Sequence, residues 1–113
     1  MPDVGNPGKR DGDDYTEAVL DVVGQIPPGR AMTYGLIAEV VAESLHRGGP
    51  RQVGTTLARY GGGVPWWRVV NASGAPPAGW ATEALANLRA EGCPLRSSGD
   101  RVDLRRAIWF PGS

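Results

Sequence analysis

The most informative stretch of the sequence is Val64-Pro65-Trp66-Trp67-Arg68-Val69-Val70-Asn71, which follows three glycines at 61–63. Pro65 has no backbone N–H and restricts the residue before it to extended conformations, so the chain enters Trp66 rigidly from a mobile glycine loop. We interpret Arg68-Val69-Val70 as a short buried strand, with both indoles directly before its first residue. Two interpretations are equally open from these residues alone: one indole packs inward while the other faces a cavity, or both are core tryptophans.

Length and composition predict one small folded domain, because 113 residues with a 41% hydrophobic share fit a single modest core. The sequence has no apolar run long enough to span a bilayer and no charged-then-apolar leader, so we expect a cytoplasmic protein without a membrane partner. Cys93 is the single cysteine and His46 the single histidine. An internal disulfide is therefore impossible, Cys93 is expected to be a buried thiol, and we expect no metal and no cofactor.

Charge is unevenly distributed although the formal net charge is zero. Residues 1–21 are acidic, whereas residues 30–70 contain five arginines and only two glutamates. Since arginine binds phosphate bidentately, the middle of the chain is suited to an anionic partner. Ordinary charge scatter on a solvated surface would give the same count, so charge alone does not decide the function.

The spacing of apolar residues predicts a mainly helical chain. Residues 1–13 are rich in Gly, Pro and Asp without periodicity and are predicted to be a disordered tail. Helices are predicted over about 15–25, from a cap at Thr33 to near Gly48, over 50–60 starting with Pro50, and over about 80–90. Residues 93–97 and 101–104 flank a Ser-Gly-Asp turn, which predicts a β-hairpin.

The third predicted helix has one polar face. Arg51, Thr55 and Arg59 are spaced i, i+4 and i+8, and Gln52 lies beside them. Two short helices joined by a glycine turn indicate a helix-turn-helix, for which the hairpin would supply a wing. We therefore predict a mainly α fold with a small β wing, a winged helix-turn-helix that forms a single domain over residues 14–113.

Five motifs in order resemble the DNA-binding domain of the O6-alkylguanine-DNA alkyltransferases: residues 26–30, 33–35, 51–54, 65–70 and 91–92. In that family the fourth motif reads Pro-Cys-His-Arg, and its cysteine takes the alkyl group from a guanine flipped out of the duplex. Trp66 occupies the cysteine's place here, which is the mark of the alkyltransferase-like proteins. Those proteins bind O6-alkylguanine without repairing it and flag it for nucleotide-excision repair.

The resemblance implies a protein without enzymatic activity. Alkyl transfer needs a thiolate activated by a neighbouring base, and an indole is far too weak a nucleophile. In the transferases a histidine and the glutamate of a Glu-Gly pair deprotonate the thiol. Trp67 takes the place of that histidine, so Glu91 has no base to relay to, and Cys93 is expected on the far side of the fourth helix. We expect no catalytic residue.

The resemblance also assigns roles in binding. Arg51 would fill the space that the flipped base leaves, and Tyr34 would turn its phosphate, although a surface arginine and an aromatic at a helix start are the ordinary interpretations. Trp66 and the loop over 70–79 would form the lesion pocket. Expected DNA contacts are Tyr34, Arg51, Gln52, Thr55 and Arg59; the expected pocket residues are Trp66, Trp67, Arg68, Val70, Ser73 and Gly74.

The expected partners are duplex DNA that contains O6-alkylguanine, bound from the minor groove, and the damage-sensing proteins of nucleotide-excision repair. We expect a monomer that is associated with the nucleoid when bound to DNA. Two other classes remain open. A sequence-specific winged-helix regulator would need more base-edge donors than Arg51, Gln52 and Arg59 offer. A residual enzyme would have to use Cys93 as its acceptor.

Overall fold

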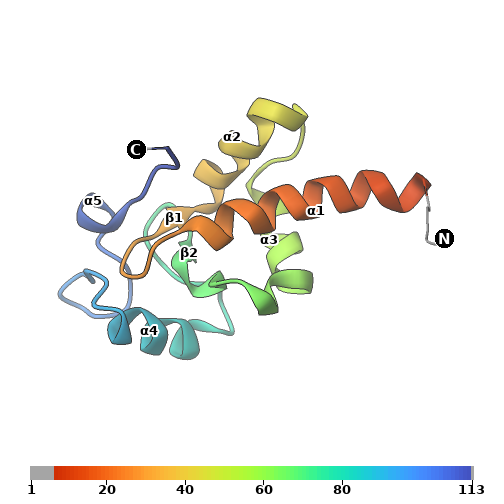
Figure 1. Ribbon diagram of the computed structural model, residues 1–113. Helices are drawn as coiled ribbons and strands as arrows, with labels where there is room; N and C mark the ends of the chain where they lie inside the picture. Colours follow the sequence, from red (N-terminus) through yellow and green to blue (C-terminus); the bar gives the residue numbers. More distant parts are fainter. Residues whose placement is uncertain (1–6, 113) are drawn as a thin grey trace.

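The computed structural model describes residues 7–112, with side chains from residue 14 onward. Figure 1 shows the long helix α1 (Pro7–Gln25) across the middle of the view, α2 (Tyr34–Leu45) above it, α4 (Ala81–Ala90) below the two short strands and α5 (Leu104–Ala107) at the left. The fold is mainly helical with a small sheet, as predicted. The elements are α1 (Pro7–Gln25), β1 (Met32–Thr33), α2 (Tyr34–Leu45), α3 (Pro50–Tyr60), two 3₁₀ turns (Gly61–Gly63 and Trp66–Arg68), β2 (Val69–Val70), α4 (Ala81–Ala90) and α5 (Leu104–Ala107).

The first helix is longer than its apolar pattern indicates. It begins at Pro7, so residues 7–13 of the predicted disordered tail are helical, and residues 1–6 of that tail lie outside the described residues. Proline is well suited to a first helical turn, and extending an existing helix is far easier than starting one. The prediction was wrong over 7–13 because it required apolar periodicity for every helical turn.

The helix-turn-helix is built as the cap residues predict. The Thr33 hydroxyl oxygen accepts a hydrogen bond from the Leu36 N–H at 3.0 Å and starts α2. The helix ends at Leu45, slightly earlier than predicted, because His46 adopts a left-handed conformation with φ 58°. The third helix spans the predicted residues, and the Gln52 side chain accepts from the Gly49 N–H at its start, at 2.9 Å.

The sheet is a single parallel pair in which Met32 is opposite Val69 and Thr33 is opposite Val70. The predicted strand is therefore present over Val69–Val70, while Arg68 belongs to the preceding 3₁₀ turn. Both valines are fully buried, but they face different cores because successive strand residues point to opposite sides. Val69 packs into the cluster formed by α1, α2 and α3, and Val70 into a second cluster with α4 and the C-terminal segment.

The predicted wing is reduced to one antiparallel bridge between Leu95 and Val102. A longer pair of strands does not form, because Val102 donates its N–H to the Gly74 carbonyl at 2.8 Å. The Arg101 carbonyl still accepts from the Arg96 N–H at 2.9 Å, so the turn itself closes. The chain then enters α5, which has no apolar period of its own and was not predicted.

None of the helices in the described part of the chain is both long enough and apolar enough to cross a membrane. Over the same residues, no three His, Cys, Asp or Glu side chains are grouped so as to hold a metal ion.

Gly74 joins the loop after β2 to the C-terminal segment, and we predict that Gly74→Ala is strongly destabilising. Its φ is +87°, and an added Cβ would overlap the backbone carbonyl oxygen of Val102. Strain and overlap together should lower the free energy of unfolding by about 3 kcal/mol. Gly79→Ala is the matched control, because Gly79 has φ +86° and open space around its Cβ position. It should cost only about 1 kcal/mol in urea denaturation; equal losses would show that the Val102 contact is unimportant.

Candidate nucleic-acid interface

The polar face predicted for α3 exists and is exposed to solvent. Arg51, Gln52, Thr55 and Arg59 are all exposed, while Val53 and Thr56 are buried on the opposite side. The Thr55 hydroxyl donates to the Arg51 carbonyl at 3.1 Å, which keeps that side chain close to the helix. The Arg51 and Arg59 side chains are exposed on this slim helix, and such a geometry suits contact with a nucleic-acid backbone.

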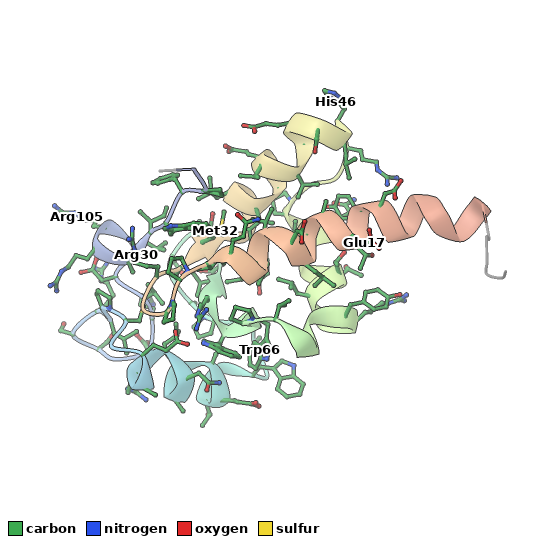
Figure 2. All side chains as sticks on the ribbon, in the orientation of Figure 1. Glu17, Arg30, Met32, His46, Trp66 and Arg105 are labelled. Carbon is green, nitrogen blue, oxygen red and sulfur yellow. The ribbon has the colours of Figure 1, made fainter. Side chains whose placement is uncertain are left out.

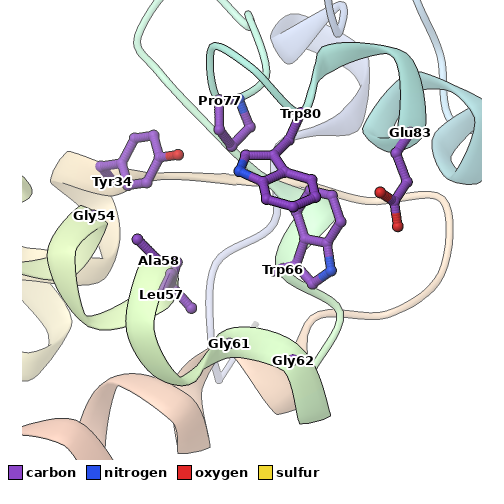
Figure 3. Close-up of a pocket in the computed structure, with 10 residues that line it drawn as sticks. All are labelled: Tyr34, Gly54, Leu57, Ala58, Gly61, Gly62, Trp66, Pro77, Trp80 and Glu83. Atoms are coloured by element: carbon purple, nitrogen blue, oxygen red, sulfur yellow. The ribbon is translucent and has the colours of Figure 1, made fainter.

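An open, mainly apolar cavity of about 250 Å³ lies beside this face. It is enclosed by α3, the turn that carries Trp66, and the start of α4 (Figure 3). The side-chain view places Trp66 between α3 and α4, far from His46 and Arg105 at the molecule's edges (Figure 2). The lining residues are Tyr34, Gly54, Leu57, Ala58, Gly61, Gly62, Trp66, Pro77, Trp80 and Glu83.

The two adjacent tryptophans diverge. Their rings meet edge to face, with centroids 5.9 Å apart and planes at 84°. Trp66 lines the cavity and makes a second edge contact with Trp80 at 6.1 Å, whereas Trp67 packs against the second core. Of the two interpretations open from the sequence, the structure therefore has one indole inward and one at a cavity.

Trp67 is fixed by the partly buried carboxylate of Glu91. Its Nε1–H donates to Glu91 at 2.9 Å, and the Arg68 guanidinium donates to both oxygens of the same carboxylate. The Gly29 N–H donates to Glu91 at 3.2 Å, and Arg68 also donates to the Ile26 carbonyl at 2.7 Å. Glu91 therefore ties the turn after α1, the tryptophan turn and the end of α4 together.

Electrostatics around Glu91 favour an ionised carboxylate and a neutral thiol. Burial alone would raise the pKa of Glu91, but hydrogen bonds from Arg68, Trp67 and Gly29 outweigh it and lower the pKa. Burial, with the nearby Glu91 charge, raises the pKa of Cys93 to about 11 against a weaker opposing effect of Arg30. The Cys93 thiol is therefore protonated at neutral pH, is 6% exposed and does not line the cavity, which argues against it as an alkyl acceptor.

Of the six expected pocket residues, only Trp66 lines the cavity. Trp67 and Arg68 turn inward to Glu91, and Val70 is buried in the second core. The Asn71 side chain accepts hydrogen bonds from the backbone of Ser73 and Ala75, and this turn carries the loop toward Val102 instead of Trp66. Ser73 and Gly74 are consequently not part of the cavity wall.

Several wall residues were missed. Gly54, Leu57, Ala58 and Gly61 recur at helical spacing next to the arginine face, a signal that could have identified them. Trp80 is 59% exposed, and the available sequence signal was an indole directly after a Pro-Pro-Ala-Gly loop.

Tyr34, which was expected at the DNA, lines the cavity and is half-buried, and burial raises its pKa. A Cβ on Gly54 would come within 3.8 Å of the Tyr34 ring, an ordinary van der Waals distance, so the ring packs next to α3 at Gly54. Tyr34 therefore lies where the cavity meets the polar face of α3.

A second, more open hollow of about 450 Å³ lies on the other side of α3. Its lining residues include Tyr15, Arg47, Gln52, Arg59 and Tyr60. The Arg47 guanidinium lies 5.6 Å from the centre of the Tyr15 ring. Gln52, Thr55 and Arg59 of the polar face line this second hollow, whereas Arg51 lines neither hollow and is presented on the ridge between them.

Taken together, the helix-turn-helix, its exposed arginines and the adjoining aromatic cavity define a DNA-binding domain with an apolar cavity beside its polar helix face. The family described as "6-O-methylguanine DNA methyltransferase, DNA binding domain" matches residues 14–93. The chain belongs to this family, and its relatives place it among the alkyltransferase-like members.

Two curated relatives are called DNA base-flipping proteins. The one from Vibrio parahaemolyticus (serotype O3:K6, strain AQ3810) is 31% identical over 103 residues, which cover 88% of this chain and 99% of the relative. The one from Escherichia coli (strain K12) is 36% identical over 104 residues, which cover 86% of this chain and 75% of the relative. The crystal structure of S. pombe Atl1 with damaged DNA containing O6-carboxymethylguanine is 29% identical with a TM-score of 0.72, covering 88% of this chain and 97% of that one.

We predict that Glu91 makes stability depend on pH. Its folded-state pKa lies below the ordinary value of 4.5, so its contribution is present at neutral pH and is lost as pH falls from 4.5 through the folded pKa. Glu91→Gln should lower the free energy of unfolding at pH 7 by about 2 kcal/mol and flatten this acid dependence. Glu43→Gln, at an exposed position of α2, is the control and should change neither. Parallel curves for the parent and Glu91→Gln between pH 3 and 7 would contradict the assignment.

Proposed function

We propose that this chain is a non-enzymatic DNA-damage recognition protein that binds O6-alkylguanine in duplex DNA by flipping the modified base into the Trp66 cavity. One observation carries the proposal: the apolar cavity opens directly beside the arginine face of α3. A helix docked in the minor groove by that face would bring the cavity next to the base it displaces. Base-flipping relatives and the Atl1–DNA complex support this function.

Flipping needs something to occupy the vacated stack and something to receive the base. Arg51, exposed on the ridge of α3, is suited to enter the duplex, and Tyr34 at the cavity edge is suited to turn the phosphate. Trp66 then offers an aromatic wall for the base and its alkyl group. Stacking on an aromatic stabilises a base by roughly 1–3 kcal/mol, which offsets much of the few kcal/mol that flipping costs.

The same residues explain why we propose binding without alkyl transfer. An indole at Trp66 fills the acceptor's place, and the Trp67 N–H is a donor bound to Glu91, so it cannot act as a base. Cys93 is buried in the second core as a neutral thiol. A protein that holds the lesion without removing it needs a partner that completes the repair. We therefore propose that the bound complex, formed in the cytoplasm at the nucleoid, is recognised by damage-sensing proteins of nucleotide-excision repair.

The first test compares duplexes that differ by one O6-methyl group. We expect the protein to bind the O6-methylguanine duplex at least tenfold more tightly than the unmodified duplex in a gel-shift titration, with no change in protein mass afterwards. Trp66→Ala should lose most of this preference, because the aromatic wall is gone. Phe110→Ala removes a 48% exposed aromatic that does not line the cavity and should keep it. No preference in the parent, or a covalent alkyl group on Cys93, would refute the proposal.

The second test separates Arg51 from the other arginine of the same face. If Arg51 fills the vacated stack, Arg51→Ala should weaken binding to lesion DNA by about tenfold or more and reduce the preference over unmodified duplex. Arg59→Ala should remove only a backbone contact, so both duplexes should lose affinity equally and the salt dependence should become less steep. Equal effects of the two variants on the preference would reduce Arg51 to a phosphate contact.

A further inference from the structure

Glu83 gives the lesion cavity a charge of one sign. Among the described residues that line the cavity, it is the one charged side chain, and no arginine or lysine is among them. It stands in the first turn of α4, close to Trp80, and it lies beside Trp66 in the close-up (Figure 3). The remaining wall consists of aromatic, aliphatic, proline and glycine residues.

Among the described residues that line the cavity, no cationic side chain compensates for this carboxylate. The amino end of α4 carries a partial positive charge of about half a unit, but Glu83 in the first turn opposes it with a full negative charge. The faces of Trp66 and Trp80 are electron-rich, so they attract cations and repel anions. Aliphatic Leu57 and Pro77 give little solvation to an ion.

From this arrangement we infer that the cavity selects O6 substituents by charge. Neutral and cationic groups are accepted, and anionic groups are disfavoured, with Glu83 as the specificity-determining residue. The inference rests on the proposed function, because it takes the flipped guanine as the occupant. It goes further by naming the chemical class of adduct that this chain binds best.

The expected discrimination is moderate because Glu83 is exposed. Two like charges roughly 6 Å apart in a partly solvated site repel weakly to moderately, and salt screens part of this repulsion. We therefore expect a difference of about threefold to tenfold in dissociation constant at low salt, which shrinks as salt is added.

A matched pair of adducts isolates the charge. O6-carboxymethylguanine and O6-carbamoylmethylguanine have nearly the same shape, but the first ends in a carboxylate and the second in a neutral amide. Dissociation constants are measured by fluorescence anisotropy for both duplexes and for the unmodified duplex. The parent should bind the amide duplex about threefold to tenfold more tightly than the carboxylate duplex. Glu83→Gln should bring this ratio close to one, mainly by tightening the carboxylate complex.

Glu43→Gln provides the control, since it removes an equal charge from α2 at a position that does not line the cavity. It should strengthen binding to all three duplexes alike and leave the amide-to-carboxylate ratio at the parent value. A parent ratio of one, or a ratio that Glu83→Gln does not change, would overturn the inference while the lesion-binding function stands. If neither modified duplex is bound more tightly than the unmodified one, the proposed function and this inference both fall.

Discussion

Glu91 accepts hydrogen bonds from three residues in two segments that are far from it in the sequence, and the shape of the site depends on it. Arg68 and Trp67 reach it from the tryptophan turn, and the Gly29 N–H reaches it from the turn after α1. The ion pair is largely screened from water, with side-chain exposures of 12% and 15%. Such a pair is costly to break from one side, because the remaining charge would be left without its partner. The turn is thereby held in one orientation, and Trp66 is left facing the cavity.

The geometry of the 3₁₀ turn Trp66–Arg68 makes two residues that are adjacent in sequence point in different directions. A 3₁₀ turn has three residues per turn, so consecutive side chains leave it about 120° apart. Trp66 and Trp67 accordingly point in different directions, toward the cavity and toward the second core. The Arg68 guanidinium lies 5.5 Å from the centre of the Trp67 ring and packs against it on the way to Glu91. A residue that anchors the turn and a residue that lines the cavity can therefore share one short motif.

The elements with strong local signals were predictable. Thr33 as a cap, Pro50 as a first-turn residue and the apolar period of α3 determine their helices within a few residues, and the structure agrees. The wing and the pocket wall depend instead on tertiary hydrogen bonds. Nothing local shows that Val102 will bond to Gly74, and that bond prevents a long hairpin and removes the 71–75 loop from the cavity. The polar face of α3 could be predicted from the helical spacing of Arg51, Thr55 and Arg59 alone, whereas Trp80 lines the cavity only because of long-range packing.

These dependencies separate the part of the site that must be rigid from the part that can vary. Trp67 packs against the second core, and its hydrogen bond to Glu91 together with the Arg68–Glu91 ion pair orients the turn, so substitutions at these residues affect stability first. Trp80 and Glu83 are exposed residues at the start of α4, and Trp80 contacts the Trp66 ring with its own ring. Because exposed residues can change with little effect on folding, the outer wall is where the specificity of such a cavity can differ between proteins of the same fold. Trp66, in contrast, is constrained, because the Glu91 carboxylate fixes the turn that carries it.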